Sequence, residues 1–151
     1  MATTVEAAEL SVNITESISL NGVDYGNNLS QTYSTVGEVD QRIMSIAPGE
    51  GTFTNIFSFS TEDGQGTGVK ASYKYFRITN LDDTNFVTLQ IKGTADTFWI
   101  KLKSGDSFML MDNEMDAIDS STTFGAFTDI TLVAANADTA AVDIEYVTLA
   151  T

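Results

Sequence analysis

The chain contains no cysteine and no histidine, and these two absences exclude several kinds of chemistry. Without Cys there is no disulfide framework, no thiolate metal site and no cysteine nucleophile. Without His there is no side chain whose ordinary pKa of about 6.5 suits it to proton transfer near neutral pH. The sequence therefore lacks both the commonest general base and the commonest metal ligand of proteins.

Long apolar runs are also absent, since none approaches the ~18 residues that a membrane-spanning helix needs. The first six residues, Met1-Ala-Thr-Thr-Val-Glu6, have neither the basic region nor the apolar stretch of a secretion signal. We therefore expect a soluble protein that is made in the cytoplasm and contacts no membrane.

Basic residues are scarce: seven Lys and Arg stand against 21 Asp and Glu, which gives a net charge of −14. Residues 1–69 contain one basic and nine acidic residues. Residues 70–103 contain six basic and three acidic residues, and residues 104–151 contain nine acidic residues and no basic one. Such a charge opposes nucleic-acid binding, because phosphate contacts need clustered Lys and Arg. Two interpretations stay open: the acidity serves solubility, or the Lys-bearing face of one copy meets an acidic face of its neighbour or of another protein.

Apolar and polar residues alternate through most of the chain, which predicts half-buried β-strands. With 151 residues and turn signals between the tracts, this pattern predicts one all-β domain over residues 1–151, an antiparallel β-sandwich or jelly roll. A change of phase within residues 70–79 predicts a β-bulge there. About nine strands are expected, in residues 10–20 (ending at Asn21-Gly22), 39–47, 53–59, 70–79, 86–91, 97–103, 107–111, 130–135 and 141–149.

Helical periodicity is almost missing, and short helices are expected at most in residues 5–10 and 112–118. Residues 1–9 lack a clear strand pattern. We expect them to form an N-terminal arm that is either flexible or ordered by a partner.

Residues 112–119 are rich in acids and suggest a calcium site, because Ca²⁺ prefers several oxygen ligands close together. The spacing does not fit an EF-hand, since Ala117 stands in place of the turn glycine and Thr123 in place of the bidentate Glu. A site of another type, built from Asp112, Glu114 and Asp116, is the weak alternative to a solvated acidic loop, which we favour. We predict no metal and no cofactor.

Two adjacent carboxylates, Asp82 and Asp83, could in principle act as acid and base, as in glycosidases. They lie in the turn Asn80-Leu-Asp-Asp-Thr-Asn85, whose residues typically bond their own backbone. We favour a structural turn, and we predict that the protein is not an enzyme and has no catalytic residues.

The one tryptophan lies in the positive segment, in the tract Phe98-Trp-Ile-Lys-Leu-Lys103. Strand alternation places Phe98, Ile100 and Leu102 on one face, which we expect to build the core, and Trp99, Lys101 and Lys103 on the other, outward face. Trp99 is then an interface anchor beside lysines, or it packs under a loop, or it offers a stacking surface to a sugar ring. The interface candidates of the sequence are Trp99, Lys101, Lys103, Lys70 and Lys74.

Residues 77–87, 98–108 and 137–147 resemble small β-rich virion proteins of tailed bacteriophages, many of them aquatic. In that type a strand leads through an Asn-rich turn to a second strand, a hairpin like Leu102-Lys-Ser-Gly-Asp106 follows, and the last strand reads like Val142-Asp-Ile-Glu-Tyr-Val147. The resemblance covers roughly residues 73–149 and consists of structural motifs, so it transfers no catalytic residues.

The resemblance implies a non-enzymatic structural protein of the virion, made in the host cytoplasm. We expect a capsid decoration or cement protein that binds the major capsid protein or other virion proteins. It is expected to be a homo-oligomer, with a trimer favoured, and to bind no nucleic acid. The alternatives are a tail, head-fibre or head-to-tail connector component, or a carbohydrate-binding β-sandwich module.

Overall fold

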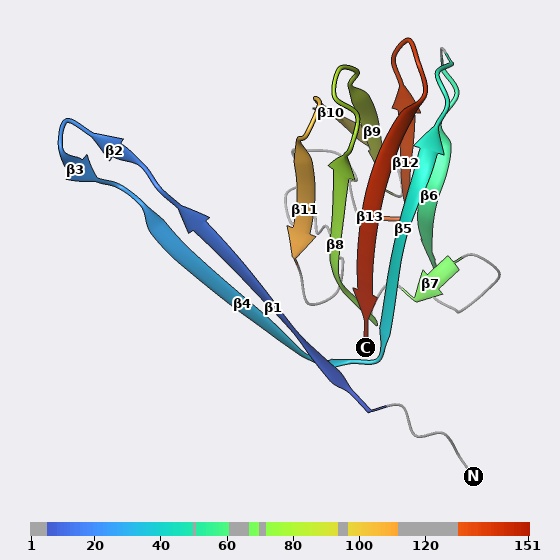
Figure 1. Ribbon diagram of the computed structural model, residues 1–151. Helices are drawn as coiled ribbons and strands as arrows, with labels where there is room; N and C mark the ends of the chain where they lie inside the picture. The colour runs from blue at the N-terminus through green and yellow to red at the C-terminus, as the bar shows by residue number, and fades with distance from the viewer. Residues whose placement is uncertain (1–5, 50, 61–66, 70–71, 94–96, 112–129) are drawn as a thin grey trace, which may run out of the picture.

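The computed structural model describes residues 6–49, 51–60, 67–69, 72–93, 97–111 and 130–151, and the regular elements among them are β-strands (Figure 1). The prediction of an all-β fold is confirmed, with more strands than the nine expected. The thirteen strands of this described part are β1 (Ala8–Glu16), β2 (Ser19–Leu20), β3 (Val23–Asp24), β4 (Asn27–Val36), β5 (Glu38–Ile46), β6 (Thr54–Ser60), β7 (Thr67–Val69), β8 (Tyr73–Asn80), β9 (Val87–Lys92), β10 (Thr97–Leu102), β11 (Ser107–Met111), β12 (Leu132–Ala137) and β13 (Val142–Ala150).

Two sheets pack face to face and form a β-sandwich. One sheet has five strands in the order β10-β9-β12-β6-β7, and the other has four in the order β11-β8-β13-β5. Neighbouring strands run antiparallel, except that β6 and β7 are parallel. The prediction of an antiparallel sandwich is therefore confirmed.

The main core lies between the two sheets and follows from strand alternation. In β9, for example, Val87, Leu89 and Ile91 are fully buried, while Thr88 and Gln90 between them are only partly buried. Each such apolar side chain stabilises the fold by roughly 1.5–3 kcal/mol relative to an exposed position. The opposite sheet supplies, among others, Ile46, Phe76, Ile78, Val142 and Ile144.

The strand β8 shifts phase along its length, as its sequence predicts. Tyr73 and Phe76 both pack on the main core, whereas Tyr75 between them belongs to a cluster on the other face of the sheet. The pairing of β8 with β13 slips between Leu149 and Ala150 at the same place. The bulge predicted within residues 70–79 is confirmed.

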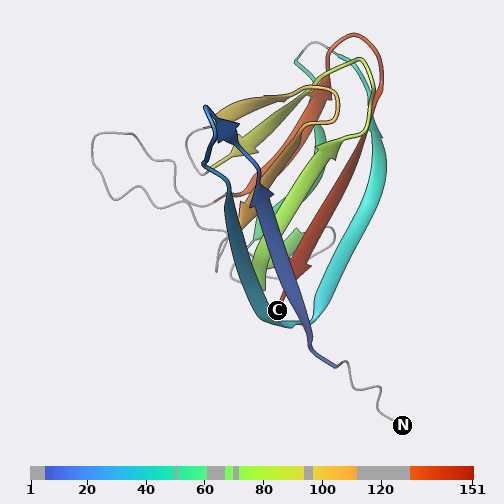
Figure 2. The same ribbon diagram turned by 60° about the vertical axis from the view of Figure 1, so that its left-hand side comes forward.

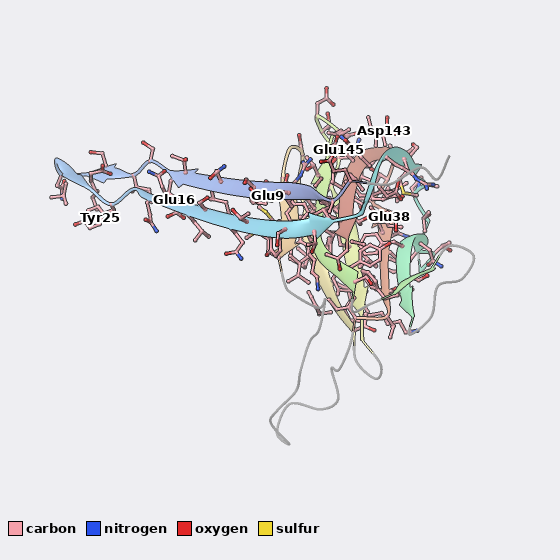
Figure 3. The ribbon with its side chains drawn as sticks, turned by 90° about the horizontal axis from the view of Figure 1, so that it is seen from below. Glu9, Glu16, Tyr25, Glu38, Asp143 and Glu145 are labelled. Carbon is pink, nitrogen blue, oxygen red and sulfur yellow. The ribbon has the colours of Figure 1, made fainter. Side chains whose placement is uncertain are left out.

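A long antiparallel hairpin, which we call the hairpin arm (residues 8–36), projects from the sandwich. It consists of β1 paired with β4 and ends in the short β2–β3 hairpin. Figure 2 shows the arm in front of the four-stranded sheet, and Figure 3 shows it extending away from the sandwich. The sequence predicted a strand in residues 10–20, but it predicted neither β4 in residues 27–36 nor that this hairpin leaves the sandwich.

The predictions for the N-terminal region and for the acidic segment have different outcomes. The prediction of a short helix in residues 5–10 is wrong for residues 8–10, which belong to β1 and pair with β4. Of the expected N-terminal arm (1–9), residues 1–5 lie outside the described part, and residues 8 and 9 belong to β1. The helix expected in residues 112–118 lies outside the described residues.

Candidate functional site

The hairpin arm forms because the alternating strand β1 pairs along its length with β4, and a tight turn lies at the tip between them. Its strands pair residue for residue, with Val12 opposite Gln31 and Ile14 opposite Leu29. At the tip, Asn21 and Gly22 have φ of 52° and 78°. A two-residue hairpin turn of type I′ needs positive φ at both positions, which Asn-Gly adopts most easily.

Gly26 allows the arm to continue from its tip into β4. A Cβ atom at this position would lie 2.5 Å from the carbonyl oxygen of Glu16, which is too close for any other residue. The Gly26 backbone N–H donates to Oδ1 of Asp24 over 2.8 Å, and this bond holds the bend. The bend between β3 and β4 therefore depends on this glycine.

The base of the arm is anchored on the outer face of the four-stranded sheet. Tyr33 and Val36 of β4 are buried there against Tyr75 of β8 and Leu149 of β13. Partly buried apolar residues surround this second cluster, namely Leu10, Val12, Met109, Met111 and Val147. The contact fixes the direction in which the rest of the arm leaves the sandwich.

Beyond this base the arm presents large apolar side chains to solvent. They are between 50% and 59% exposed, and they are Ile18, Leu20, Val23, Tyr25 and Leu29. An isolated two-stranded hairpin is at best marginally stable in water, and clustered exposed apolar side chains usually mark an interaction site. The outer arm therefore has the composition of a surface that another molecule covers.

The charges of the arm are all of one sign. It carries Glu9, Glu16 and Asp24, and residues 1–41 contain no Lys or Arg. Figure 3 shows Glu9, Glu16 and Tyr25 along its length. Glu9 lies at the anchored base, next to Leu10, whereas Glu16 and Asp24 make the apolar outer arm acidic as well.

A surface of opposite charge lies on the edge strand β10 and its neighbour β9. Neither β9 nor β10 contains an acidic residue. Strand register places Trp99 opposite Gln90 and Lys101 opposite Thr88, on the outer face of the five-stranded sheet. We call the exposed residues Lys92, Trp99, Lys101 and Lys103 the basic face.

The local environment of the basic face agrees with part of the sequence prediction. Trp99 is 58% exposed, which confirms that it lies on the outward face of its strand. The Nζ atom of Lys101 lies 3.4 Å from the centroid of the Phe86 ring, a cation–π contact that orients the lysine. Phe98 was expected in the core but is 40% exposed, because β10 is an edge strand. Ile100 and Leu102 pack on the core as predicted.

The other predicted site residues do not join the basic face. Lys74 lies on β8 in the four-stranded sheet, and Lys70 lies outside the described residues. The weak metal candidates Asp112, Glu114 and Asp116 also lie outside them. Among the residues that the structure does describe, no group of three or more acidic side chains is arranged to hold a metal ion.

A shallow pocket of about 540 Å³ lies beside the basic face. Its lining combines two aromatic rings with polar side chains, and includes Phe53, Phe86, Thr88, Asn136 and Asp138. The Asn136 amide donates to the carbonyl oxygens of Gly49 and Thr52, so it holds the neighbouring loop. Sequence patterns did not indicate this pocket, because its residues come from separate segments of the chain.

The carboxylate of Asp82 is bound within its own turn. The backbone N–H groups of Asn85 and Thr84 donate to Oδ1 over 2.6 and 2.8 Å, and they lower the pKa of Asp82 below its usual value. A general acid needs the opposite shift, so that it keeps its proton near neutral pH. This geometry agrees with the predicted structural turn.

The outer face of the four-stranded sheet carries a polar network next to the base of the arm. Nη2 of Arg77 lies 2.8 Å from Oε2 of Glu145, and the Gln41 amide donates to Oε1 over 2.7 Å. Both donors, first Gln41 and then Arg77, lower the pKa of Glu145. The network links β5, β13 and β8 and stiffens the sheet on which the arm is anchored.

No protein-family model, curated protein or solved structure matches this chain. In the described part of the chain, there is no helix of the length and apolar character needed to cross a membrane.

Proposed function

We propose that the protein is a non-enzymatic structural component of a bacteriophage virion, a capsid decoration or cement protein that stabilises the shell by binding capsomers. The resemblance of residues 77–87, 98–108 and 137–147 to such proteins supports this proposal. A rigid sandwich with a long projecting arm also suits a protein whose task is to connect other subunits.

The observation that carries the proposal is the hairpin arm itself. It extends beyond its anchored base with five large apolar side chains exposed, and packing against the described part of its own chain does not cover them. A monomeric soluble protein rarely keeps such a surface uncovered, because burial of apolar area is the main gain in association. An assembly would cover it.

The basic face adds a second surface of a different kind. Trp is enriched among residues that dominate binding energy, and the lysines around Trp99 would orient an acidic partner. The two surfaces lie on opposite sides of the sandwich, since the arm is anchored on the four-stranded sheet. One copy can thus contact two different neighbours, as a shell component must.

The test is to quantify the protein in purified phage particles by mass spectrometry against the major capsid protein. A copy number on the order of hundreds per particle supports a decoration role at many equivalent sites. A count in the tens or fewer would favour a tail, head-fibre or connector component. Absence from the particles would refute the proposal.

A carbohydrate-binding module is the second candidate, and the exposed Trp99 beside the pocket at Phe53 and Phe86 favours it. Aromatic rings stack on sugar rings, and the polar lining could bind hydroxyl groups. Glycan-array binding that is lost in Trp99→Ala, and retained in Tyr25→Ala on the arm, would support this candidate over the assembly role.

A further inference from the structure

We infer that the hairpin arm of one copy docks on the basic face of a second copy of the same chain, in a head-to-tail contact. The inference rests on the proposed assembly function and names the partner of its two surfaces. It joins the acidic apolar outer arm to the surface formed by Lys92, Trp99, Lys101 and Lys103.

The two surfaces are complementary in charge. The outer arm carries Glu16 and Asp24 and no cation, whereas β9, β10 and Lys103 carry cations and no acid. The carboxylate nearest to Lys103 in sequence, Asp106, accepts a hydrogen bond from the Lys103 backbone N–H over 3.1 Å. The ammonium group of Lys101 lies over the ring of Phe86, which leaves its charge at the surface.

The two surfaces also match in apolar character. The outer arm offers Ile18, Leu20, Val23 and Tyr25, and the basic face offers Trp99, with Phe98 exposed at the same sheet edge. Trp and Tyr bury large areas with little loss of side-chain freedom, so they favour such a contact. The contact would bury apolar area in its centre and place charges around it.

An arm cannot reach the basic face of its own chain. Tyr33 and Val36 fix the base of the arm on the outer side of the four-stranded sheet, whereas Trp99 and Lys101 lie on the outer side of the five-stranded sheet. From Ile14 to the tip the arm extends only about 20 Å at ~3.3 Å per residue, and it points away from the sandwich (Figure 3). The docking must therefore occur between copies.

A contact between two different surfaces is heterologous, and repeated copies then form a closed ring or an open chain. The angle at which the arm leaves the sandwich decides between them, because it sets the rotation from one copy to the next. Each copy would dock its own arm on one neighbour and bind the arm of another neighbour at its basic face.

The test uses the full chain and compares self-association by sedimentation velocity and light scattering. The arm variant Glu16→Lys, Asp24→Asn reverses the charge of the outer arm, and the amide oxygen introduced by Asp24→Asn keeps an acceptor for the Gly26 N–H. The face variant Lys101→Glu, Lys103→Glu reverses the basic face. Each should raise the dissociation constant at least about tenfold, and combining both sets in one chain should restore association.

The matched control is Glu38→Lys, Asp143→Lys, which reverses two exposed carboxylates outside the arm (Figure 3). It should leave the dissociation constant unchanged, and circular dichroism should show the same fold in every variant. Failure of the combined variant to regain association, with the fold intact, would overturn the charge-matched docking.

The two proposals fail in different ways. A chain that stays monomeric at about 100 µM but is present on particles would overturn the docking between copies and leave the virion role, with the shell as the partner of the arm. A chain that associates with the expected charge dependence but is absent from particles would keep the docking and overturn the virion role.

Discussion

At the scale of single residues, Asn80 holds together the turn that contains Asp82. Its side chain is fully buried, and its amide nitrogen donates to the carbonyl oxygens of Asn85 and Leu102 over 2.9 and 3.2 Å. Its Oδ1 atom accepts from the Asp82 N–H over 2.9 Å. One side chain thus satisfies three backbone groups from two segments.

We predict that Asn80→Ala lowers the free energy of unfolding by about 2–3 kcal/mol, because it leaves buried backbone groups without partners. Urea unfolding followed by circular dichroism measures the change. The same substitution at the exposed Asn28 of the arm should change stability by less than about 0.5 kcal/mol. Equal effects at the two positions would contradict the structural role of Asn80.

Glu145 gives the fold a dependence on pH. Hydrogen bonds from Gln41 and Arg77 lower its pKa below 4.5 in the folded state, so the unfolded state takes up a proton first on acidification. The stabilisation is complete above about pH 4.5 and is lost as the pH falls through the lower folded-state pKa.

We predict that Glu145→Gln costs roughly 0.5–1 kcal/mol at pH 7, because the ion pair with Arg77 is partly exposed. The difference from the wild type should shrink below about pH 4.5, where the carboxylate takes up a proton first in the unfolded state and then, at lower pH, in the folded state. Urea unfolding at pH 7 and pH 3 tests this, with Asp143→Asn as a control on the same strand. A difference that persists unchanged at pH 3 would contradict the prediction.

At the scale of elements, the hairpin arm differs from the strands of the sandwich in what stabilises it. The strand β13 pairs on both sides and buries alternate side chains in the core. The arm has one pairing only and packs at its base alone. We therefore expect its base to contribute to the stability of the fold and its outer part to contribute little.

We predict that Leu149→Ala, in the cluster under the base of the arm, lowers the free energy of unfolding by about 2–4 kcal/mol because it leaves a cavity. Leu29→Ala on the outer arm should cost less than about 0.5 kcal/mol in the dissociated protein. Thermal and urea unfolding at low protein concentration compare the two. A large cost at Leu29 would mean that the outer arm packs on its own chain.

Amide hydrogen exchange should show the same difference between the outer arm and the strands of the sandwich. We expect residues 14–29 to exchange much faster than β13 in the dissociated chain, because a lone hairpin opens easily. Their protection should rise on association, with a smaller rise in the face variant Lys101→Glu, Lys103→Glu. Strong protection of the outer arm at all concentrations would contradict this.

At the scale of the whole molecule, we propose that folding and assembly depend on different parts of the chain. Replacing residues 16–27 by Asn-Gly would connect Thr15 to its partner Asn28 through a two-residue turn. This change would shorten the arm without disturbing its base. We predict that this variant unfolds within a few degrees of the wild type and does not self-associate. Differential scanning calorimetry and sedimentation velocity measure the two effects, and association at the wild-type strength would show that the outer arm is not used.

Sequence patterns predicted much of the fold because they depend on local alternation. The Asn21-Gly22 turn, the bulge near Tyr75 and the opposite faces of Trp99 and Leu102 all follow from neighbours in the chain. Phe98 was misplaced because the same alternation does not reveal whether a strand lies at a sheet edge. The strand β4 was missed because its large apolar residues Leu29, Tyr33 and Val36 are spaced by four and three positions and do not alternate. The exit of residues 8–36 from the sandwich could not be predicted either, since the alternation of β1 does not differ from that of a core strand.

The sequence by itself determined that the protein is an all-β chain, that residues 1–69 are strongly acidic and that its cations gather in residues 70–103. Composition and period are properties of the chain, so these conclusions needed no contacts between distant residues. Only the tertiary structure decided which strands form the sandwich and which leave it, and that the acidic arm and the basic face lie on opposite sides. Those facts depend on packing between segments far apart in sequence, such as Tyr33 against Leu149.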